Sequence, residues 1–168
     1  MKTLYAVFFA FFVLSIVSCS DEEEPRSPLI GTWENRNYVD SLELWFVNTY
    51  NFRNDSIFDI TSTVRETEIG NDLGYRLIST AWYNLESDIF QYYYDDGLFH
   101  FGGGEDDPLY VPEKDLKPGI IDFFRIPKGK LTFSNDFRQF TFQEDCWKPN
   151  PENEDCFEFP VKTFVRVD

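Results

Sequence analysis

Few side chains of this sequence are suited to catalysis. The chain of 168 residues has one histidine, His100, which lies on a short expected strand next to a glycine-rich segment. A serine hydrolase of the elbow type places its nucleophile on a sharp strand-to-helix turn, and no such motif accompanies His100. One histidine also excludes a metal site built from several histidines. We therefore expect no enzymatic activity and no cofactor.

The acidic side chains are numerous, with 30 Asp and Glu against 15 Lys and Arg and a net charge of -15. Such a charge repels phosphate backbones, so we expect no binding to nucleic acid. The clusters Asp95-Asp96 and Glu105-Asp106-Asp107 carry hard oxygen ligands of the kind that Ca²⁺ prefers. Neither has the spacing of an EF-hand, so solvated acidic loops are the simpler interpretation and no metal site is predicted.

The N-terminus has the parts of an export signal. Met1-Lys2 is positively charged, and a mostly apolar run follows from Leu4 to Val17. A membrane-spanning helix needs about 20 apolar residues, so this shorter run predicts a signal peptide over residues 1–18. An uncleaved anchor is the alternative.

The end of the apolar run, Ser15-Ile16-Val17-Ser18-Cys19, resembles the lipobox of bacterial lipoproteins. The resemblance implies that Cys19 becomes the first residue of the mature chain and carries the acyl chains, such as palmitate, that attach it to a membrane. Residues 19–28 are acidic and contain prolines, which indicates an extended tether. They are similar to the export signal of surface lipoproteins of the Bacteroidota, with a plain solvated spacer as the alternative. We therefore expect the protein to be anchored to the cell outer membrane, on either its periplasmic or its outer face.

Two cysteines remain once Cys19 is committed to lipid. Cys146 and Cys156 lie at the two ends of a proline-rich segment. Outside the cytoplasm such a pair is expected to form a disulfide, which would close a short loop and contribute about 3 kcal/mol in the chain-entropy model.

Alternation of apolar and polar residues at period 2 recurs from Leu29 onward, without a sustained helical period. Residues 29–168 are therefore predicted to form one all-β domain, an antiparallel up-and-down barrel of about eight or nine strands. Expected turns include Asp95-Asp96-Gly97 and Pro127-Lys128-Gly129, and residues 102–119 are expected to form a long loop. The alternation predicts strands over 42–53, 58–65, 75–85, 89–94, 98–101, 120–126, 130–134, 138–143 and 156–167.

The first strand carries a family resemblance. Leu29-Ile30-Gly31-Thr32-Trp33 resembles the Gly-x-Trp start of lipocalins and of lipocalin-like bacterial lipoproteins, and residues 163–167 are similar to their closing strand. Shorter likenesses lie at 49–56, 80–85 and 130–133. The resemblance implies a lipocalin-like barrel whose closed end is covered by Trp33, with Arg166 over the indole in a structural cation–π contact.

A small set of residues is the candidate lining of a ligand cavity. Polar side chains interrupt an otherwise apolar phase at Asn48, Ser62, Ser79 and Thr163, and Tyr83 shares the inward phase of its strand. Aligned at one level of the barrel, they would line a polar-spotted cavity. A dry core in which every hydroxyl is hydrogen-bonded is the alternative.

The run Tyr92-Tyr93-Tyr94 alternates between faces, so either Tyr93 or the other two are exposed. Exposed aromatic rings beside carboxylates suit sugar stacking, although packing within the protein is the commoner role.

Two functions follow from these observations. The first is an outer-membrane-anchored, lipocalin-like lipoprotein that binds a small apolar or amphipathic molecule without catalysis. The alternative is a filled barrel that serves as a protein- or glycan-interaction module at the cell surface, through the long loop and the disulfide-bridged hairpin. The sequence identifies no protein partner.

Overall fold

The computed structural model of this chain describes residues 27–102, 104, 106–119, 126–148 and 156–168, and within them the prediction of a nearly all-β chain is confirmed. The helical structure among these residues is one short 3-10 helix, η1, at Glu113–Asp115. The strands are β1 (Gly31–Val39), β2 (Leu44–Phe52), β3 (Ile57–Arg65), β4 (Asp72–Glu86), β5 (Ile89–Phe99), β6 (Lys117–Gly119), β7 (Lys128–Phe133), β8 (Gln139–Glu144) and β9 (Lys162–Arg166).

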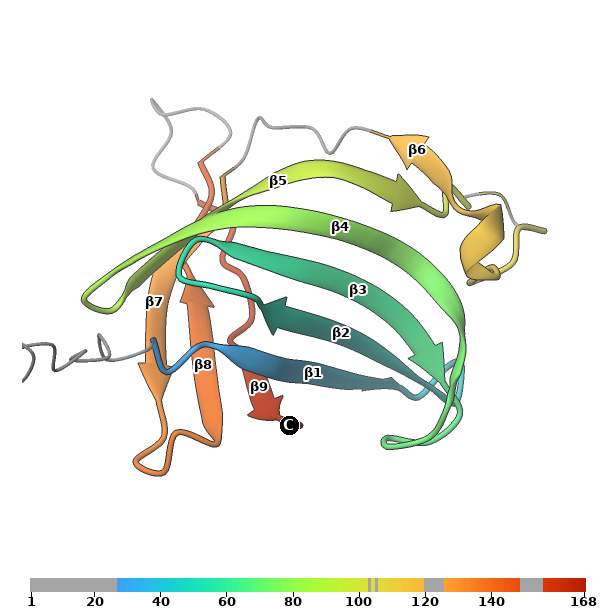
Figure 1. The fold of residues 1–168 in the computed structure, drawn as a ribbon. Coiled ribbons are helices and arrows are strands. Elements are labelled where there is room, and N and C mark those ends of the chain that lie inside the picture. Colours follow the sequence, from blue (N-terminus) through green and yellow to red (C-terminus); the bar gives the residue numbers. More distant parts are fainter. Residues whose placement is uncertain (1–26, 103, 105, 120–125, 149–155) are drawn as a thin grey trace, which may run out of the picture.

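The strands close into an antiparallel barrel of eight, in the order β4-β3-β2-β1-β9-β8-β7-β5, because β5 also pairs with β4. The ninth strand, β6, pairs with the last residues of β5 outside this ring. Figure 1 shows the curved sheet of β1 to β5 running across the view, with β7, β8 and β9 closing it on the left. The predicted barrel is confirmed, and its shape is compatible with a lipocalin-like fold.

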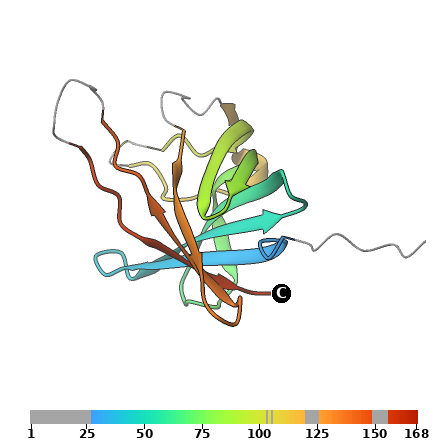
Figure 2. The same ribbon diagram turned by 90° about the vertical axis from the view of Figure 1, so that its left-hand side faces the viewer.

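The two ends of the barrel differ because the strands differ in length. β4 has 15 residues, whereas β9 has 5 and pairs with β1 only at Trp33 and Glu34. Beyond these pairs the long strands continue without β9 beside them, as Figures 1 and 2 show. We call the end at which β1 begins the closed end, and the end to which β1, β3 and β5 run the wide end.

The hydrophobic core fills the closed end. Alternate residues of each strand point inward, as the period-2 pattern predicts. Trp33 and Phe58 are fully buried, and the rings of Phe140 and Phe164 stack at 4.7 Å. The buried cluster consists of Leu29, Trp33, Tyr50, Phe52, Phe58, Ile60, Ala81, Tyr83, Phe90, Tyr92, Leu131, Phe140, Phe142 and Phe164.

The predicted hairpin at Asp95-Asp96-Gly97 is wrong, because β5 runs straight through these residues. The pairing with β4 shifts by one residue between Ser79 and Ala81, which is a β-bulge. The Ser79 hydroxyl lies 3.5 and 3.4 Å from the carbonyl oxygens of Asp95 and Asp96, so it supports the bulge. Gly97 fits opposite Ser79 because a Cβ there would lie 2.9 Å from the Phe99 ring. Turn-forming residues therefore mark a bulge here.

Two further strand predictions need correction. Lys128 and Gly129 do not form a turn, since they pair with Gln91 and Phe90 as the start of β7. The last strand spans only Lys162–Arg166, and residues before it form a single bridge between Trp147 and Phe157. The strand expected at 120–126 lies outside the described residues except for Ile126.

The segment 102–119 is more ordered than a plain long loop. It contains η1 and β6, and Val111 exchanges two backbone hydrogen bonds with Tyr75 of β4, at 2.8 and 3.1 Å. The Tyr110 ring lies against Gly74, where an added Cβ would come within 2.5 Å of it. The segment therefore packs along β4 at the wide end.

An ion cluster ties the strands together on the outer wall. The Glu34 carboxylate accepts hydrogen bonds from Arg36 at 2.7 Å and from Arg65 at 2.8 Å. Arg65 also donates to Asp72 at 2.6 Å, which joins β3 to the start of β4. Burial by itself would raise the pKa of Glu34, but the two guanidinium groups outweigh it and lower that pKa.

Candidate ligand-binding site

A polar row crosses the inner face of β1, β2 and β3 directly above the aromatic core. The register places Asn35 opposite Asn48, and Asn48 opposite Ser62. The neighbouring row toward the closed end is Trp33, Tyr50 and Ile60, all buried. The interior thus changes character within one step along each strand, from apolar to polar.

The members of this row differ in how their polar atoms are used. Asn35 is buried, and its side-chain amide donates to the Thr163 carbonyl at 2.8 Å while its oxygen accepts from Asn37 at 2.8 Å. Asn48 and Ser62 are half-buried, and neither side chain hydrogen-bonds to another described residue. No buried side-chain polar atom of the described residues lacks a partner, so the polar atoms of these two side chains are accessible from outside and can hydrogen-bond to water or to a bound molecule.

A line of hydroxyl groups leads from the core to the same level. The Tyr50 and Tyr92 oxygens lie 3.4 Å apart, and those of Tyr92 and Tyr94 are also 3.4 Å apart. Tyr50 and Tyr92 are buried and Tyr94 is half-buried. Burial raises the pKa of both Tyr50 and Tyr92 well above the usual value, so the hydroxyls stay neutral and can donate or accept.

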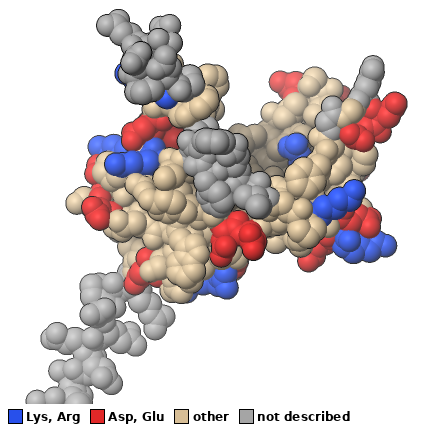
Figure 3. Space-filling model, turned by 90° about the horizontal axis from the view of Figure 1, so that it is seen from above, with Lys and Arg blue, Asp and Glu red and all other residues tan. Residues whose placement is uncertain are grey.

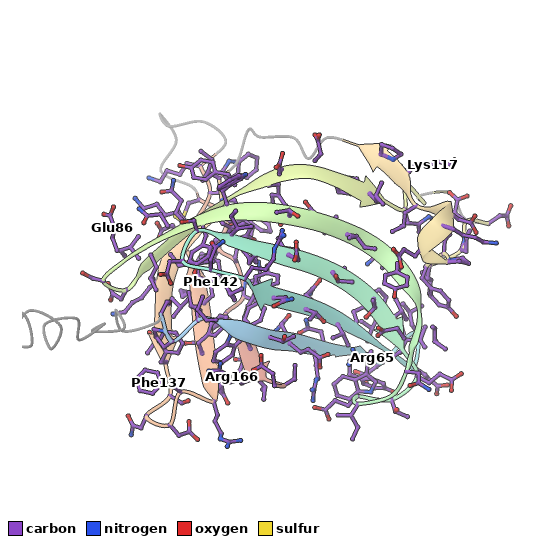
Figure 4. The ribbon with its side chains drawn as sticks, in the orientation of Figure 1. Arg65, Glu86, Lys117, Phe137, Phe142 and Arg166 are labelled. Atoms are coloured by element: carbon purple, nitrogen blue, oxygen red, sulfur yellow. A yellow bond between two sulfur atoms is a disulfide. The ribbon has the colours of Figure 1, made fainter. Side chains whose placement is uncertain are left out.

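A buried acid lies on β8, which β7 separates from β5 in the barrel. The Glu144 side chain of β8 is only 2% exposed, and its carboxylate lies 3.3 Å from the Lys162 ammonium of β9. The charge of Glu144 also helps to raise the pKa of Tyr50, after burial and the influence of Tyr94. Lys162 lies over the Phe142 ring at 5.9 Å and is partly exposed. Figure 4 shows Phe142 inside the crowded left half of the barrel.

Apolar side chains adjoin this polar layer. On the wide-end side the next row of β2 and β3 pairs Phe46 with Val64, and Arg76 lies over the Phe46 ring at 5.2 Å. At the level of Ser62, Leu77 pairs with Phe99, and both are half-buried. Polar groups bordered by partly buried apolar walls are the usual composition of a small-molecule site.

The residues expected to line a cavity are therefore only partly brought together. Asn48 and Ser62 are adjacent, while Ser79 lies at the bulge of β5. Tyr83 lies at the closed end, where its hydroxyl donates to the Asn54 carbonyl at 2.8 Å and burial raises its pKa to about 12. Thr163 is exposed on the outer face, because the inward residues of β9 are Lys162, Phe164 and Arg166. Thr163 therefore does not line the interior of the barrel.

Trp33 and Arg166 lie together at the closed end. The guanidinium is 5.2 Å from the centre of the indole ring, and the indole nitrogen donates to the Leu29 carbonyl at 2.7 Å. Arg166 also donates to the Ile30 carbonyl at 2.5 Å and to Asp168 at 2.9 Å. This network holds the two side chains together at the closed end, as the family resemblance implies.

The cysteine prediction is confirmed for the pair, since Cys146 and Cys156 form a disulfide with Cα atoms 5.6 Å apart. Cys19, the signal peptide and the acidic tether before Ser27 lie outside the described residues. In the described ranges no helix is long and apolar enough to cross a membrane.

Sequence reasoning missed three residues of this layer. Glu144 shares the inward phase of Phe140 and Phe142, and Asn35 shares that of Trp33. Lys162 precedes Phe164 by two residues in the same way. The period-2 pattern could have found all three, had charged and amide side chains been allowed at inward positions.

Other polar clusters offer no comparable site. Among the described residues no group of three His, Cys, Asp or Glu side chains could hold a metal ion. The His100 ring nitrogen hydrogen-bonds to the Pro108 carbonyl, which ties it to the loop after β5. No family model, curated protein or solved structure matches the chain, so its assignment rests on the barrel and the side chains described above.

Proposed function

We propose that this protein binds a small amphipathic molecule at the wide end of its barrel, without catalysis. One observation carries the proposal: Asn48 and Ser62 lie side by side above a closed aromatic core, half-buried and without a hydrogen-bond partner among the described residues. A polar group of the ligand would meet these side chains and the Tyr94 hydroxyl. Its apolar part would lie along Phe46, Leu77 and Phe99.

The alternative of a purely structural polar layer is less consistent with the pattern of hydrogen bonds. Asn35, in the same row, is fully engaged, which shows what a structural amide looks like in this barrel. Every buried side-chain nitrogen and oxygen of the described residues has a hydrogen-bond partner. The unpaired polar atoms of Asn48 and Ser62 are therefore open to solvent, and they can bond to a ligand without losing a partner within the barrel.

A dye-binding experiment tests the proposal. The full chain in detergent is titrated with Nile red, an uncharged apolar dye with a polar carbonyl, and its fluorescence is followed. Ser62→Phe should fill the layer and abolish the enhancement, and Asn48→Leu should weaken it. Thr163→Phe is the matched control, because that side chain is exposed on the outer face. Equal loss in Thr163→Phe, or unchanged binding in both inner variants, would contradict the proposal.

We further propose that Cys19 anchors the chain to the outer membrane through lipid. The sequence before Ser27 supports this proposal, as does the position of β1, whose first residues lie at the closed end. Residues 19–26 of the tether can extend at most about 3.6 Å per residue from that end. The wide end would then be the part of the barrel farthest from the tether. Labelling of cells with radioactive palmitate should mark the wild-type chain and leave Cys19→Ser unlabelled.

An interaction module is the second candidate function, favoured by the two segments that the disulfide joins. Trp147 and Phe157 are exposed, and they exchange two backbone hydrogen bonds beside the disulfide Cys146–Cys156. The disulfide and these hydrogen bonds hold the two aromatic side chains close together on the surface. Crosslinking of intact cells before and after reduction would test it. Loss of a specific crosslinked partner on Trp147→Ser, with an unchanged dye titration, would favour this function over the first.

A further inference from the structure

A second candidate site lies on the outer wall, away from the interior layer. Trp82 of β4 and Tyr93 of β5 are directly opposite each other in the register, and they are 51% and 39% exposed. Side chains directly opposite on one face have Cβ atoms about 4.5 to 5.5 Å apart. The two rings therefore form one aromatic surface on the convex side of the sheet.

Polar groups border the aromatic pair one step along the strands. Asp59 pairs with Thr80, and the Asp59 carboxylate accepts hydrogen bonds from Arg53 at 2.7 Å and from the Thr80 hydroxyl at 2.9 Å. Across β5 the bulge brings Asp95 and Asp96 opposite Thr80, both exposed. Beside Tyr93, the Gln91 amide hydrogen-bonds to the tyrosine hydroxyl.

A groove of about 540 Å³ continues from this polar row. Its walls are mostly apolar, with Ile78 opposite Leu98 and Leu98 opposite Pro118 of β6. Asp59, Thr80 and Asp96 form its near edge. Since each row is about 6.7 Å from the next along a strand, the aromatic pair, the polar row and the groove together span about 13 Å. That length suits a short chain molecule.

The chemistry of this strip selects the occupant. A polyanion is disfavoured by three local carboxylates and by the net charge of -15. A purely apolar molecule would remove water from the charged Arg53 and Asp59 side chains and offer no hydrogen bond in its place, which is costly although the two groups pair with each other. A hydroxyl-rich chain donates to acceptor-only carboxylates, accepts from the guanidinium, and lays its C–H faces on the rings. Such a ligand can satisfy the charged groups of the strip by hydrogen bonding and needs no net charge of its own.

We propose that the surface formed by Trp82, Tyr93, Asp59, Thr80 and Asp96 binds an uncharged linear glycan. This strip, which we call the convex strip, is separate from the interior layer, and the proposal does not depend on that site. Figure 3, a view of the molecule from above, shows blue basic and red acidic side chains close together at several places on the surface that it presents.

Calorimetric titration tests the proposal. The full chain, in a detergent without sugar head groups, is titrated separately with linear hexasaccharides of glucose, mannose and xylose. Hexagalacturonate and hexalysine serve as the anionic and cationic comparators. At least one uncharged hexasaccharide should bind, and Trp82→Ala should weaken it about tenfold, the effect of losing about 1.4 kcal/mol of ring stacking.

Two controls make the outcome specific. Tyr93→Ala should also weaken binding, whereas Tyr38→Ala should not, because Tyr38 is an equally exposed tyrosine on the distant outer face of β1. Ser62→Phe blocks the interior layer and should leave glycan binding unchanged, so the two proposed sites fail independently. The proposal is overturned if no uncharged hexasaccharide binds, if only hexalysine or hexagalacturonate binds, or if Tyr38→Ala loses as much affinity as Trp82→Ala.

Discussion

The closed end and the wide end of this barrel are built from the same alternating strands but differ in the burial and polarity of their inward side chains. At the closed end the inward side chains form one buried cluster, in which the Phe140 ring contacts the rings of Trp33 and Phe164. Toward the wide end the inward positions include Asn48, Ser62 and Tyr94, which are only half-buried. One end of the barrel therefore supplies stability, whereas the other keeps polar groups that packing alone does not require.

The largest loss of stability is expected for a substitution in the core of the closed end. Trp33→Ala removes a fully buried ring that contacts Phe140 at 4.8 Å and hydrogen-bonds to Leu29. We expect a loss of about 3 to 5 kcal/mol in the free energy of unfolding. Urea denaturation followed by fluorescence measures it. Leu77→Ala, a truncation at the wide end, should cost only about 1 to 2 kcal/mol, because Leu77 is half-buried. Equal losses would show that the two ends are packed alike.

A smaller effect is expected for the charges on the outer wall. Glu34→Gln leaves Arg65 and Arg36 without their shared carboxylate and should cost about 2 kcal/mol at neutral pH, below the 3 to 5 kcal/mol of a fully buried pair. Since the pKa of Glu34 is lowered in the folded state, this stability is present above pH 4.5 and is lost as the pH falls through the folded value. Denaturation curves of wild type and variant should therefore converge in acid, and a constant gap would contradict this account.

The smallest expected effects on stability concern Asn35 and Asn48, two neighbours in the polar row. Asn35→Leu removes an amide that bonds to Thr163 and Asn37, and should cost about 1 to 3 kcal/mol. Asn48→Leu removes an amide without a partner among the described residues and should be neutral or slightly stabilising. Thermal denaturation of both variants checks the contrast. A matching loss in Asn48→Leu would mean that its amide is structural.

Much of the fold followed from the period of the sequence, because side chains of a strand alternate between faces. Phe58, Ile60, Ser62 and Val64 do share the inner face, as the pattern predicts. The closed-end contact of Trp33 with Arg166 came from a family resemblance, since no local rule joins residues so far apart in the chain. The barrel's unequal strand lengths could not be predicted, because pairing between distant strands decides where each strand ends.

The errors have physical causes. The predicted inward phase of the last strand joined Phe157, Phe159, Val161, Val165 and Val167, so Thr163 was placed inside. In β9 the opposite phase points inward, since Phe164 is buried and Val165 is exposed. Asp95-Asp96-Gly97 has the composition of a turn, yet the long partner strand β4 keeps β5 paired on both sides of it. Glu144 was missed because a carboxylate is expected at an inward position only if it has a partner of opposite charge. Its partner, Lys162, lies on another strand, and the sequence does not show that the two residues meet.

The central claim, that the wide end holds a small amphipathic molecule, is tested most directly by native mass spectrometry of the full chain purified from its own cells in mild detergent. We expect a retained small mass on the wild-type chain and on Thr163→Phe. That mass should be absent from Ser62→Phe and reduced on Asn48→Leu. A bare mass on the wild-type chain after exposure to a lipid extract, or an adduct that survives Ser62→Phe, would contradict it.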